Sequence, residues 1–418
     1  MKEFDIIVFG GTGYTGIHVV REMFLTGKCE TLSWALAGRS ADKMKKVLQT
    51  IAAETNVNDY SDVGVIVANV DDIDSIEKMC VNAKLLINCV GPYYLWGRQV
   101  VEACLAANTH YLDISGEPLF MEQMEADYHE KAEELGLVIT SACGFDSVPA
   151  DVGVRYIQTH FPGTLTAIET YVNARVGDRG FSVHLPTFQC VVNGFKNRPS
   201  LIKFRKERKL SKVPKLGAPF HPKSGVWREN GLFCSPFAGS DRSVIMRTQR
   251  YLYEKGLSAP AQAGVYMSFQ STALFLYLCV FGVFFLILVN TRFGRYLLLK
   301  YPKIFTLGLV SAEGATPEQI EQASFSVTLK GQGYSYSGAT EGDPDVTVEG
   351  IVSGPDPGYV SCSRFVTQAA YSVLKHGPSN VGVLTPGAML DIPDYVERLQ
   401  KRGISFQITK TSTKSSTE

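Results

Sequence analysis

Residues 4–16 read FDIIVFGGTGYTG, and this stretch decides the fold class of the chain. Its first six residues form a short apolar run, rich in β-branched side chains, of the kind that fills a buried parallel strand. Gly11, Gly13 and Gly16 then have the G-x-G-x-x-G spacing, and a helix is predicted over 14–26. Glycine is needed where a tight turn brings the backbone close to a pyrophosphate, whose charge then lies at the helix N-terminus. The stretch therefore predicts a dinucleotide-binding unit.

The second predicted strand, 32–37, is followed by Gly38-Arg39-Ser40. NAD-specific sites usually place an acidic residue here to bind the ribose 2′-hydroxyl, whereas an arginine suits the 2′-phosphate of NADP. The sequence has no Asp or Glu between Thr31 and Ala41. We therefore expect NADP(H) in preference to NAD(H), with a solvated loop cation as the alternative role for Arg39.

Strand-like and helix-like segments alternate through the first 150 residues, and this order predicts a doubly wound parallel sheet. The later strands are expected near 63–70, 84–90, 110–114 and 137–141, and the helices from about 72, at 96–107 and at 119–135. Ligands of such sheets lie beyond the carboxyl ends of the strands. Three strand ends are therefore expected to line one crevice: 88–93, 113–117 and 143–149.

These segments belong to longer motifs that are specific in combination. The motifs are FGGTGYTG at 9–16, AGRS at 37–40, NCVGPYYLWG at 88–97, YLDISGE at 111–117 and ACGFDSVPADVG at 142–153. Through them the chain resembles the saccharopine dehydrogenase-like oxidoreductase family, which joins animal proteins to bacterial saccharopine reductases and trans-acting enoyl reductases. The similarity weakens after about residue 165 and returns in GPDPGY at 354–359 and VGVLTPGAML at 381–390.

The resemblance implies hydride transfer with a nicotinamide cofactor, and it implies a place for each site residue. The pyrophosphate would lie against the glycine turn, which consists of Gly10, Gly11, Thr12, Gly13, Tyr14, Thr15 and Gly16. The adenosine end would contact Arg39 and Ser40, and the nicotinamide ribose would contact Cys89, Val90 and Gly91. The nicotinamide ring and the substrate would face Asp113, Glu117 and the turn Cys143–Ser147. Asp113, Glu117 and Asp146 are the catalytic candidates, and Cys143 is placed in the cofactor site. The alternatives are that Asp113 or Asp146 caps a helix or holds a turn, and that Cys143 is a small buried apolar residue.

After the nucleotide unit, from about Thr166 to Ala263, the pattern changes to alternating strands and glycine-rich turns, which predicts an antiparallel sheet. The predicted fold class is α/β, with an N-terminal doubly wound Rossmann domain over 1–160 and an α+β second domain over 161–352. A C-terminal helical return to the Rossmann domain is expected over 353–408, and a loose tail over 409–418. His184 is expected to be structural or exposed, and no His or Cys spacing supports a metal site.

The charge of the chain is unevenly distributed. The 418 residues hold 41 Lys or Arg and 41 Asp or Glu, so no overall attraction to nucleic acid is expected. Residues 196–215 nevertheless hold nine Lys or Arg and one Glu, typical of a solvated face or of a surface resting on anionic headgroups. Residues 256–291 hold no charged side chain, and the apolar segment 265–291 is expected to associate with a membrane. A buried core helix is the alternative for its central residues, 273–289.

Basic residues flank the apolar segment on both sides, as expected if both ends face the cytosol. We therefore expect a hairpin or interfacial anchor, with Gly282 or Pro302 as bend points, rather than a single crossing. The predicted location is the cytosolic face of a membrane, a lipid droplet or the endoplasmic reticulum. The first apolar run is too short for a secretory signal peptide, and the nine cysteines include no C-x-x-C pair, so a secreted protein is not expected.

The leading hypothesis is an NADP(H)-dependent oxidoreductase that acts on a carbonyl, imine or enoyl group of an apolar or lipid-like substrate at a membrane or lipid-droplet surface. Saccharopine itself, a polycarboxylate, is not the expected substrate. The main alternative is a non-catalytic NADPH-binding sensor or scaffold on lipid droplets, because no Tyr-x-x-x-Lys pair follows the fourth strand. A structural coat protein with a vestigial nucleotide pocket is the third hypothesis.

Overall fold

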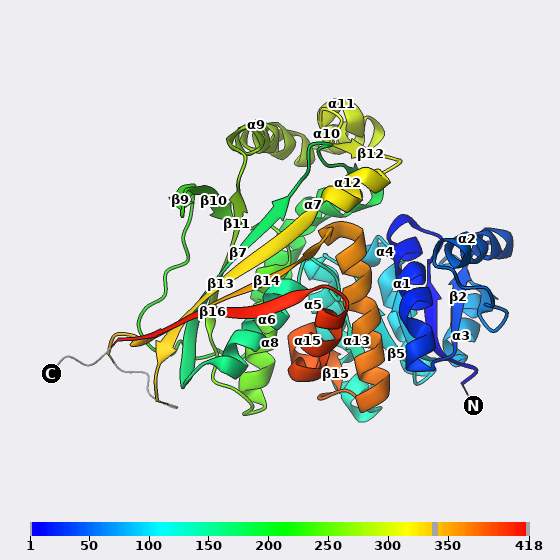
Figure 1. Ribbon diagram of the computed structural model, residues 1–418, viewed down its shortest axis with the longest axis horizontal. Helices are drawn as coiled ribbons and strands as arrows, with labels where there is room; N and C mark the ends of the chain where they lie inside the picture. Colours follow the sequence, from blue (N-terminus) through cyan, green and yellow to red (C-terminus); the bar gives the residue numbers. More distant parts are fainter. Residues whose placement is uncertain (1, 337–341, 415–418) are drawn as a thin grey trace. The chain divides into compact units, whose positions relative to one another are not determined.

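The computed structural model describes residues 2–336 and 342–414, and the chain divides into two units (Figure 1). The first unit consists of residues 1–145 and 358–402, and the second of residues 146–357 and 403–418, as far as these ranges are described. Helix α6 (Val148–His160) falls in the second unit, whereas the sequence analysis placed residues up to 160 in the first.

The sheet of the first unit has seven parallel strands in the order β15-β6-β5-β4-β1-β2-β3. The strands are β1 (Phe4–Phe9), β2 (Trp34–Gly38), β3 (Gly64–Val67), β4 (Ala83–Asn88), β5 (His110–Asp113), β6 (Val138–Thr140) and β15 (Gly382–Leu384). The six strands expected from the first 150 residues are confirmed. The seventh, β15, was missed because a three-residue apolar strand carries too little pattern to be recognised. Neighbouring β1 and β4 are where the strand order reverses, so this is the place where a doubly wound sheet binds its ligand.

Helices alternate with the strands of the first unit, as a parallel sheet requires. They are α1 (Tyr14–Glu30), α2 (Ala41–Glu54), α3 (Ile73–Val81), α4 (Tyr93–Ala106), α5 (Pro118–Glu134), α13 (Cys362–His376), α14 (Pro386–Met389) and α15 (Ile392–Lys401). Ser40 and Asp72 cap α2 and α3, because each side chain accepts a hydrogen bond from a backbone N–H of the first turn. A π-helical turn, η1 (Pro357–Ser361), precedes α13.

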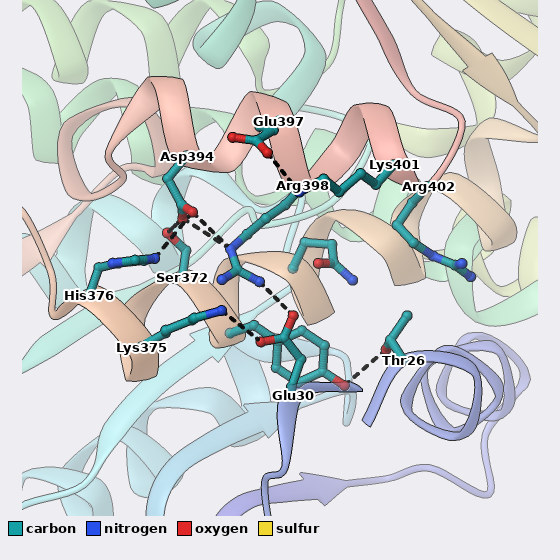
Figure 2. Close-up of polar contacts among 12 residues, drawn as sticks. Thr26, Glu30, Ser372, Lys375, His376, Asp394, Glu397, Arg398, Lys401 and Arg402 are labelled. Atoms are coloured by element: carbon teal, nitrogen blue, oxygen red, sulfur yellow. Dashed lines mark hydrogen bonds and ion pairs between the residues drawn. The ribbon is translucent and has the colours of Figure 1, made fainter. Parts of the chain in front are cut away.

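The C-terminal helices of the first unit are joined to α1 by a network of charged side chains (Figure 2). Arg398, on α15, lies between Asp394 and Glu30, and its Nη1 is 2.8 Å from Glu30 Oε1. Arg402 forms a two-bond ion pair with Glu22 of α1, at 2.8 and 2.9 Å, and Glu22 is buried. The C-terminal helices are therefore held against α1, the helix that follows the glycine turn, although they lie more than 300 residues further along the chain.

The second unit has a seven-stranded sheet in the order β16-β14-β13-β7-β11-β10-β9. Its strands are β7 (Thr164–Arg175), β9 (Trp227–Glu229), β10 (Leu232–Pro236), β11 (Gln262–Phe269), β13 (Ser324–Tyr334), β14 (Val346–Pro355) and β16 (Ser405–Thr413). All pairs are antiparallel except β7 with β11. The expected antiparallel sheet is thus confirmed in its main part. Residues 405–413 are an edge strand, whereas the sequence analysis placed a loose tail from 409, and residues 415–418 lie outside the described residues.

Helices α6 and α8 (Asp241–Glu254) pack together and against this sheet. Gly153 allows the approach, because a Cβ at this position would lie only 3.0 Å from Leu329 Cδ2. The sequence analysis expected alternating strands and glycine-rich turns over 166–263, yet α7 (Leu185–Glu207) and α8 are helices. Helix α7 escaped notice because its second half is dominated by cations and contains Pro199.

A group of helices forms one end of the second unit, where Figure 1 shows α9, α10 and α11 next to each other. They are α9 (Thr272–Val289), α10 (Arg292–Lys300) and α11 (Pro302–Phe305), and a small sheet of β8 (Val183–His184) and β12 (Val310–Ser311) lies near them. Among the described residues, α9 is the helix that is long and apolar enough to cross a membrane. It continues through Gly282 without a break. The chain turns at Asn290 and Thr291, and it turns again at the expected bend point Pro302, where α10 has ended and α11 begins.

Candidate cofactor and active site

The glycine turn between β1 and α1 is shaped by contacts that leave no space for a side chain. Gly10 has a φ of +86°, and a Cβ there would lie 2.6 Å from Val90 Cγ2. A Cβ at Gly16 would lie 2.3 Å from the carbonyl oxygen of Gly10. The described first turn of α1 holds no acidic residue, and Gly13, at the cap position, has no side chain that could accept from its N–H groups. The turn and the helix N-terminus thus offer backbone N–H groups and a positive dipole end to an anion.

The end of β2 offers a second place for an anion. Arg39 is exposed, and Ser40 Oγ accepts a hydrogen bond from Lys43 N at 3.4 Å, which starts α2. The exposed Lys43 lies one turn into the same helix. Two cations and a helix N-terminus therefore lie where the adenosine ribose of a dinucleotide is expected. Sequence reasoning gave Lys43 no role in the site.

An aromatic cluster lies on the first turns of α1. The rings of Tyr14 and Tyr359 have centroids 4.7 Å apart in an edge-on arrangement, and His18 stacks on Tyr359 at 5.6 Å. Burial, with a smaller effect of Arg21, lowers the pKa of His18 to about 4, so its imidazole is neutral at pH 7. Tyr359 comes from the π-helical turn, and sequence reasoning gave it no role in the site. The segment 354–359 thus contributes an aromatic ring next to the glycine turn.

The end of β4 lies directly beside the glycine turn. Cys89 N donates a hydrogen bond to Phe9 O at 2.8 Å, and Val90 N donates to Asn88 Oδ1 at 3.0 Å. These bonds hold Cys89 and Val90 against Gly10, and their place beside the nicotinamide ribose stays a prediction. Burial raises the pKa of the Cys89 thiol, so it stays protonated. Cys143 is also buried, with its Sγ 3.9 Å from Thr140 O.

Asp113 is completely buried at the end of β5 and accepts four hydrogen bonds. The donors are Tyr111 Oη, Ser141 Oγ and Ser115 N, each at 2.8 Å, and Ala142 N at 3.1 Å. Ala142 has a φ of +65°, a conformation that costs a non-glycine residue energy, and the Asp113 bond helps to hold it. Burial outweighs these bonds and raises the pKa of Asp113 to about 6. Asp113 therefore joins the ends of β5 and β6, which favours the turn-holding alternative, and its catalytic role stays a prediction.

Glu117 fixes the start of α4. Its two carboxylate oxygens accept hydrogen bonds from Tyr93 N at 2.9 Å and Tyr94 N at 3.1 Å. Pro92, at the cap position of this helix, makes no side-chain cap, so Glu117 supplies the missing acceptor from a distant strand end. This contact favours a structural role for Glu117, and its catalytic role also stays a prediction.

Asp146 belongs to a cluster of carboxyl groups in the second unit. Ser240 N lies 3.3 Å from both carboxylate oxygens of Asp146, and Ser240 Oγ donates to the Asp146 carbonyl at 2.6 Å. The Asp146 and Asp241 carboxyls are hydrogen-bonded to each other at the N-terminus of α8, with Asp151 near Asp241. Burial raises the pKa of Asp146 to about 6, and burial with repulsion from Asp146 and Asp151 raises that of Asp241 much further. Burial and mutual repulsion therefore both favour the protonated form of this pair.

Sequence reasoning missed Asp241, because nothing near residue 241 indicates that α8 brings it to Asp146. It also missed the contact between Tyr171 and Lys223, whose Oη and Nζ are 2.8 Å apart. Glu169 and Glu229 contact the same ammonium group. Burial raises the pKa of the Tyr171 phenol, and Glu169 adds to this rise. Tyr171 is thus a poorer proton donor at neutral pH than Asp146.

His184 ends β8, which pairs with β12, and burial lowers its pKa. Within residues 2–336 and 342–414 no cluster of three His, Cys, Asp or Glu side chains is arranged to hold a metal ion.

Comparison with known proteins agrees with this geometry. The model of the saccharopine dehydrogenase NADP binding domain matches residues 6–140. The saccharopine dehydrogenase-like oxidoreductase of Mus musculus is 38% identical over 98% of this chain and 98% of its own length. The chain belongs to the saccharopine dehydrogenase-like oxidoreductase family.

One further relative and one solved structure are also similar to this chain. The lipid droplet localized protein of Caenorhabditis elegans is 32% identical over 98% of this chain and 99% of its own length. The apo structure of saccharopine dehydrogenase (L-Glu forming) from Saccharomyces cerevisiae has a TM-score of 0.51 at 13% identity, and covers 97% of this chain and 100% of its own. The second match confirms that this family member has the saccharopine dehydrogenase fold.

Proposed function

We propose that this family member is an NADP(H)-dependent oxidoreductase that acts on a carbonyl, imine or enoyl group of an apolar, lipid-like substrate at a lipid surface. The observation that carries the proposal is the glycine turn at the reversal point of the parallel sheet, with Arg39 exposed at the end of the next strand. The name of the Caenorhabditis elegans relative and the exposed apolar helix α9 support a lipid-associated location on a membrane or droplet facing the cytosol.

The residues around the glycine turn suit a dinucleotide phosphate. The chain itself fills the Cβ positions of Gly10 and Gly16, so glycine is required for this tight turn, and in dinucleotide-binding folds such a turn lets the backbone approach the pyrophosphate. The N-terminus of α1 would hold the pyrophosphate, and Arg39, Ser40 and the missed Lys43 would hold the 2′-phosphate. When bound, a nicotinamide cofactor supplies the hydride.

Asp146 is our candidate for the proton that accompanies the hydride. Its pKa of about 6 lies close to neutral pH, and a group that titrates near the working pH is an effective general acid. Asp146 lies six residues beyond Thr140, the last residue of β6, in the segment that follows a strand end of the nucleotide unit. Asp113 and Glu117 each accept hydrogen bonds from two backbone N–H groups at 2.8–3.1 Å, whereas one backbone N–H, that of Ser240, lies 3.3 Å from the Asp146 carboxylate, so Asp146 is held less firmly.

The cofactor is tested by calorimetric titration of the full chain with NADPH and with NADH. We expect Arg39→Ala to weaken NADPH binding by roughly tenfold or more, the usual scale of a lost charge-assisted contact, and to leave NADH binding nearly unchanged. Lys45→Ala, which removes another exposed cation of α2, is the matched control. Equal loss for both cofactors, or binding of NADH in preference to NADPH by the unaltered chain, would contradict the assignment.

The enzyme hypothesis and the sensor hypothesis are separated by turnover. NADPH oxidation is followed with a lipid extract and with panels of apolar aldehydes, ketones, imines and enoyl esters. Turnover that Asp146→Asn abolishes without loss of NADPH binding is the expected result. Tight NADPH binding with no turnover on any panel would instead favour the NADPH-binding sensor or scaffold, and absence of NADPH binding would favour the vestigial pocket.

A further inference from the structure

Helix α9 presents two apolar faces, of which the protein covers one. We infer that the uncovered face, together with α10 and α11, is a membrane-docking surface. Through this surface, α9 lies in an anionic phospholipid leaflet, parallel to the plane of the leaflet, and does not cross the membrane. The inference rests on the lipid-surface location in the proposed function. It names the residues in contact with lipid and the geometry of insertion.

The exposed face of α9 is a continuous apolar stripe. Its members are between 57% and 63% exposed, and their spacing of four, three, one and three residues places them on one side of a helix. We call these residues the α9 stripe: Leu276, Val280, Val283, Phe284 and Ile287. Five large apolar side chains in a row on a helix form a surface that water does not favour, and a surface of this kind marks a membrane or protein contact.

The opposite face of α9 is fixed to the second unit. Phe285 and Val289 are buried in a cluster with Phe188 and Val192 of α7 and with Leu298 of α10. The Phe285 ring lies 5.1 Å from that of Phe195, a further residue of α7. At the start of α9, the rings of Phe275 and Phe233 stack at 4.6 Å.

A polar contact also ties the middle of α9 to the protein, since Tyr277 Oη donates to Thr306 O at 2.7 Å. A helix that crosses a bilayer would have to leave all these partners and would expose their apolar side chains to water. An α9 helix that lies flat keeps them and buries the stripe in lipid. The structure therefore favours insertion into one leaflet, at a depth of about 5–10 Å as for other interfacial helices.

The apolar surface continues beyond α9. Phe293 of α10, Ile304 of α11 and Leu307 just after it are 68% to 80% exposed. Tyr296 and Tyr301 are exposed as well, and aromatic side chains with a polar tip are enriched at the boundary between lipid and water. Lys300 Nζ lies 5.0 Å from the ring centroid of Tyr296.

The charges next to this surface indicate which lipid it meets. Arg292, Lys300 and Lys303 are exposed on α10 and α11, whereas 256–291 carries no charge. Lys303 forms a single exposed ion pair, 3.3 Å from Glu313. An apolar stripe bordered by cations matches a leaflet with apolar chains and anionic headgroups. If the stripe bound another protein instead, anionic lipid would not strengthen its binding to vesicles. We therefore commit to an anionic phospholipid leaflet as the occupant.

The first experiment is flotation of the full chain with phosphatidylcholine vesicles and with phosphatidylcholine–phosphatidylserine vesicles. We expect binding that is stronger on the anionic vesicles and that falls on the order of tenfold or more in the variant Phe284→Glu/Ile287→Glu. The variant Leu257→Glu, which changes an equally exposed apolar residue of the same unit, should bind like the unaltered chain. Equal loss in both variants, or no loss in the first, would overturn the inference.

The second experiment measures depth with vesicles whose acyl chains carry bromine at a shallow or a deep carbon. Trp is introduced singly at Leu276→Trp, Val280→Trp and Ile287→Trp. A helix in the plane gives shallow quenching at all three positions, whereas a crossing helix gives deep quenching at Val280→Trp, the middle of α9, and this result would overturn the inference.

NADPH binding by the same variants separates this inference from the proposed function. Lipid binding without NADPH binding would leave the docking surface standing and contradict the enzyme hypothesis. Sedimentation of the lipid-free chain provides a last control. If Phe284→Glu/Ile287→Glu dissociates an oligomer and leaves vesicle binding intact, the stripe is a contact between copies of the chain and the inference fails.

Discussion

Replacing Asp113 tests whether this buried carboxylate is a joint between two strand ends. In Asp113→Asn, one oxygen still accepts from Ser115 N and Ala142 N, and the amide faces two hydroxyls. Ser141 can rotate to accept, but Tyr111 Oη already accepts from Asn88 Nδ2 at 3.1 Å and loses the acceptor for its own proton. One unsatisfied buried donor costs about 1–3 kcal/mol of unfolding free energy.

The change Asp113→Ala removes both acceptor oxygens. Four buried donors then lack this acceptor, and we expect a loss on the order of 3–6 kcal/mol; the donors are Tyr111 Oη, Ser141 Oγ, Ser115 N and Ala142 N. Urea unfolding gives these free energies, and hydrogen exchange should show faster exchange at the amides of Ser115 and Ala142. Asp71→Ala, which removes an exposed carboxylate of the same unit, should stay within about 0.5 kcal/mol of the unaltered chain.

Two results would refute this account of Asp113. The first is an Asp113→Ala variant as stable as Asp71→Ala. The second is an Asp113→Asn variant that unfolds like the unaltered chain but has lost all turnover, because a group that only holds strands together would lose stability before it lost chemistry. The second result would support the catalytic role that the resemblance implied.

Three further predictions concern other parts of the chain. Gly16→Ala should abolish NADPH binding and lower the melting temperature, because the new Cβ would lie 2.3 Å from Gly10 O. A calorimetric melting curve identical to that of the unaltered chain would contradict this prediction. Arg402→Met should lower the free energy of unfolding in urea by about 2–3 kcal/mol. This loss is smaller than for a fully buried ion pair, because the Arg402 side chain is one quarter exposed. The double variant with Glu22→Met should recover part of the loss. Because the pKa of Asp146 is raised in the folded chain, its contribution to stability is present below pH 3.8 and lost as the pH rises through about 6; Asp241→Asn should weaken this dependence, and identical urea midpoints against pH in both proteins would exclude the coupling.

The sequence predicted the first unit well because its signals are local. The strand 4–9, the glycine turn and the start of α1 follow one another directly, and each requires particular residue types. The helices α7 and α8 lie in a stretch where alternating strands and glycine-rich turns were expected. Their stability comes from packing against α9 and against the second sheet, which no window of sequence contains.

The candidate site shows the same division between local and distant information. Gly10 and Arg39 are recognisable because their role depends on backbone geometry or on charge at a fixed distance from a strand. The partners of Asp146 and Tyr14 are Asp241 and Tyr359, which lie about one hundred and more than three hundred residues further along the chain. A carboxylate in a motif also has two possible uses, and only its hydrogen-bond partners distinguish a reacting group from one that supports a turn, as at Asp113 and Glu117.

The division of the chain between the two units has a consequence for its synthesis. The chain passes from one unit to the other after residues 145, 357 and 402, so each unit is built from an early and a late segment. While the ribosome is still translating, the first unit lacks β15 and α13, and the second lacks the edge strand β16. Neither sheet can be completed until nearly the whole polypeptide has emerged. A premature stop codon anywhere before residue 358 would therefore leave both units unfinished, and such fragments are expected to be substrates of chaperones and proteases.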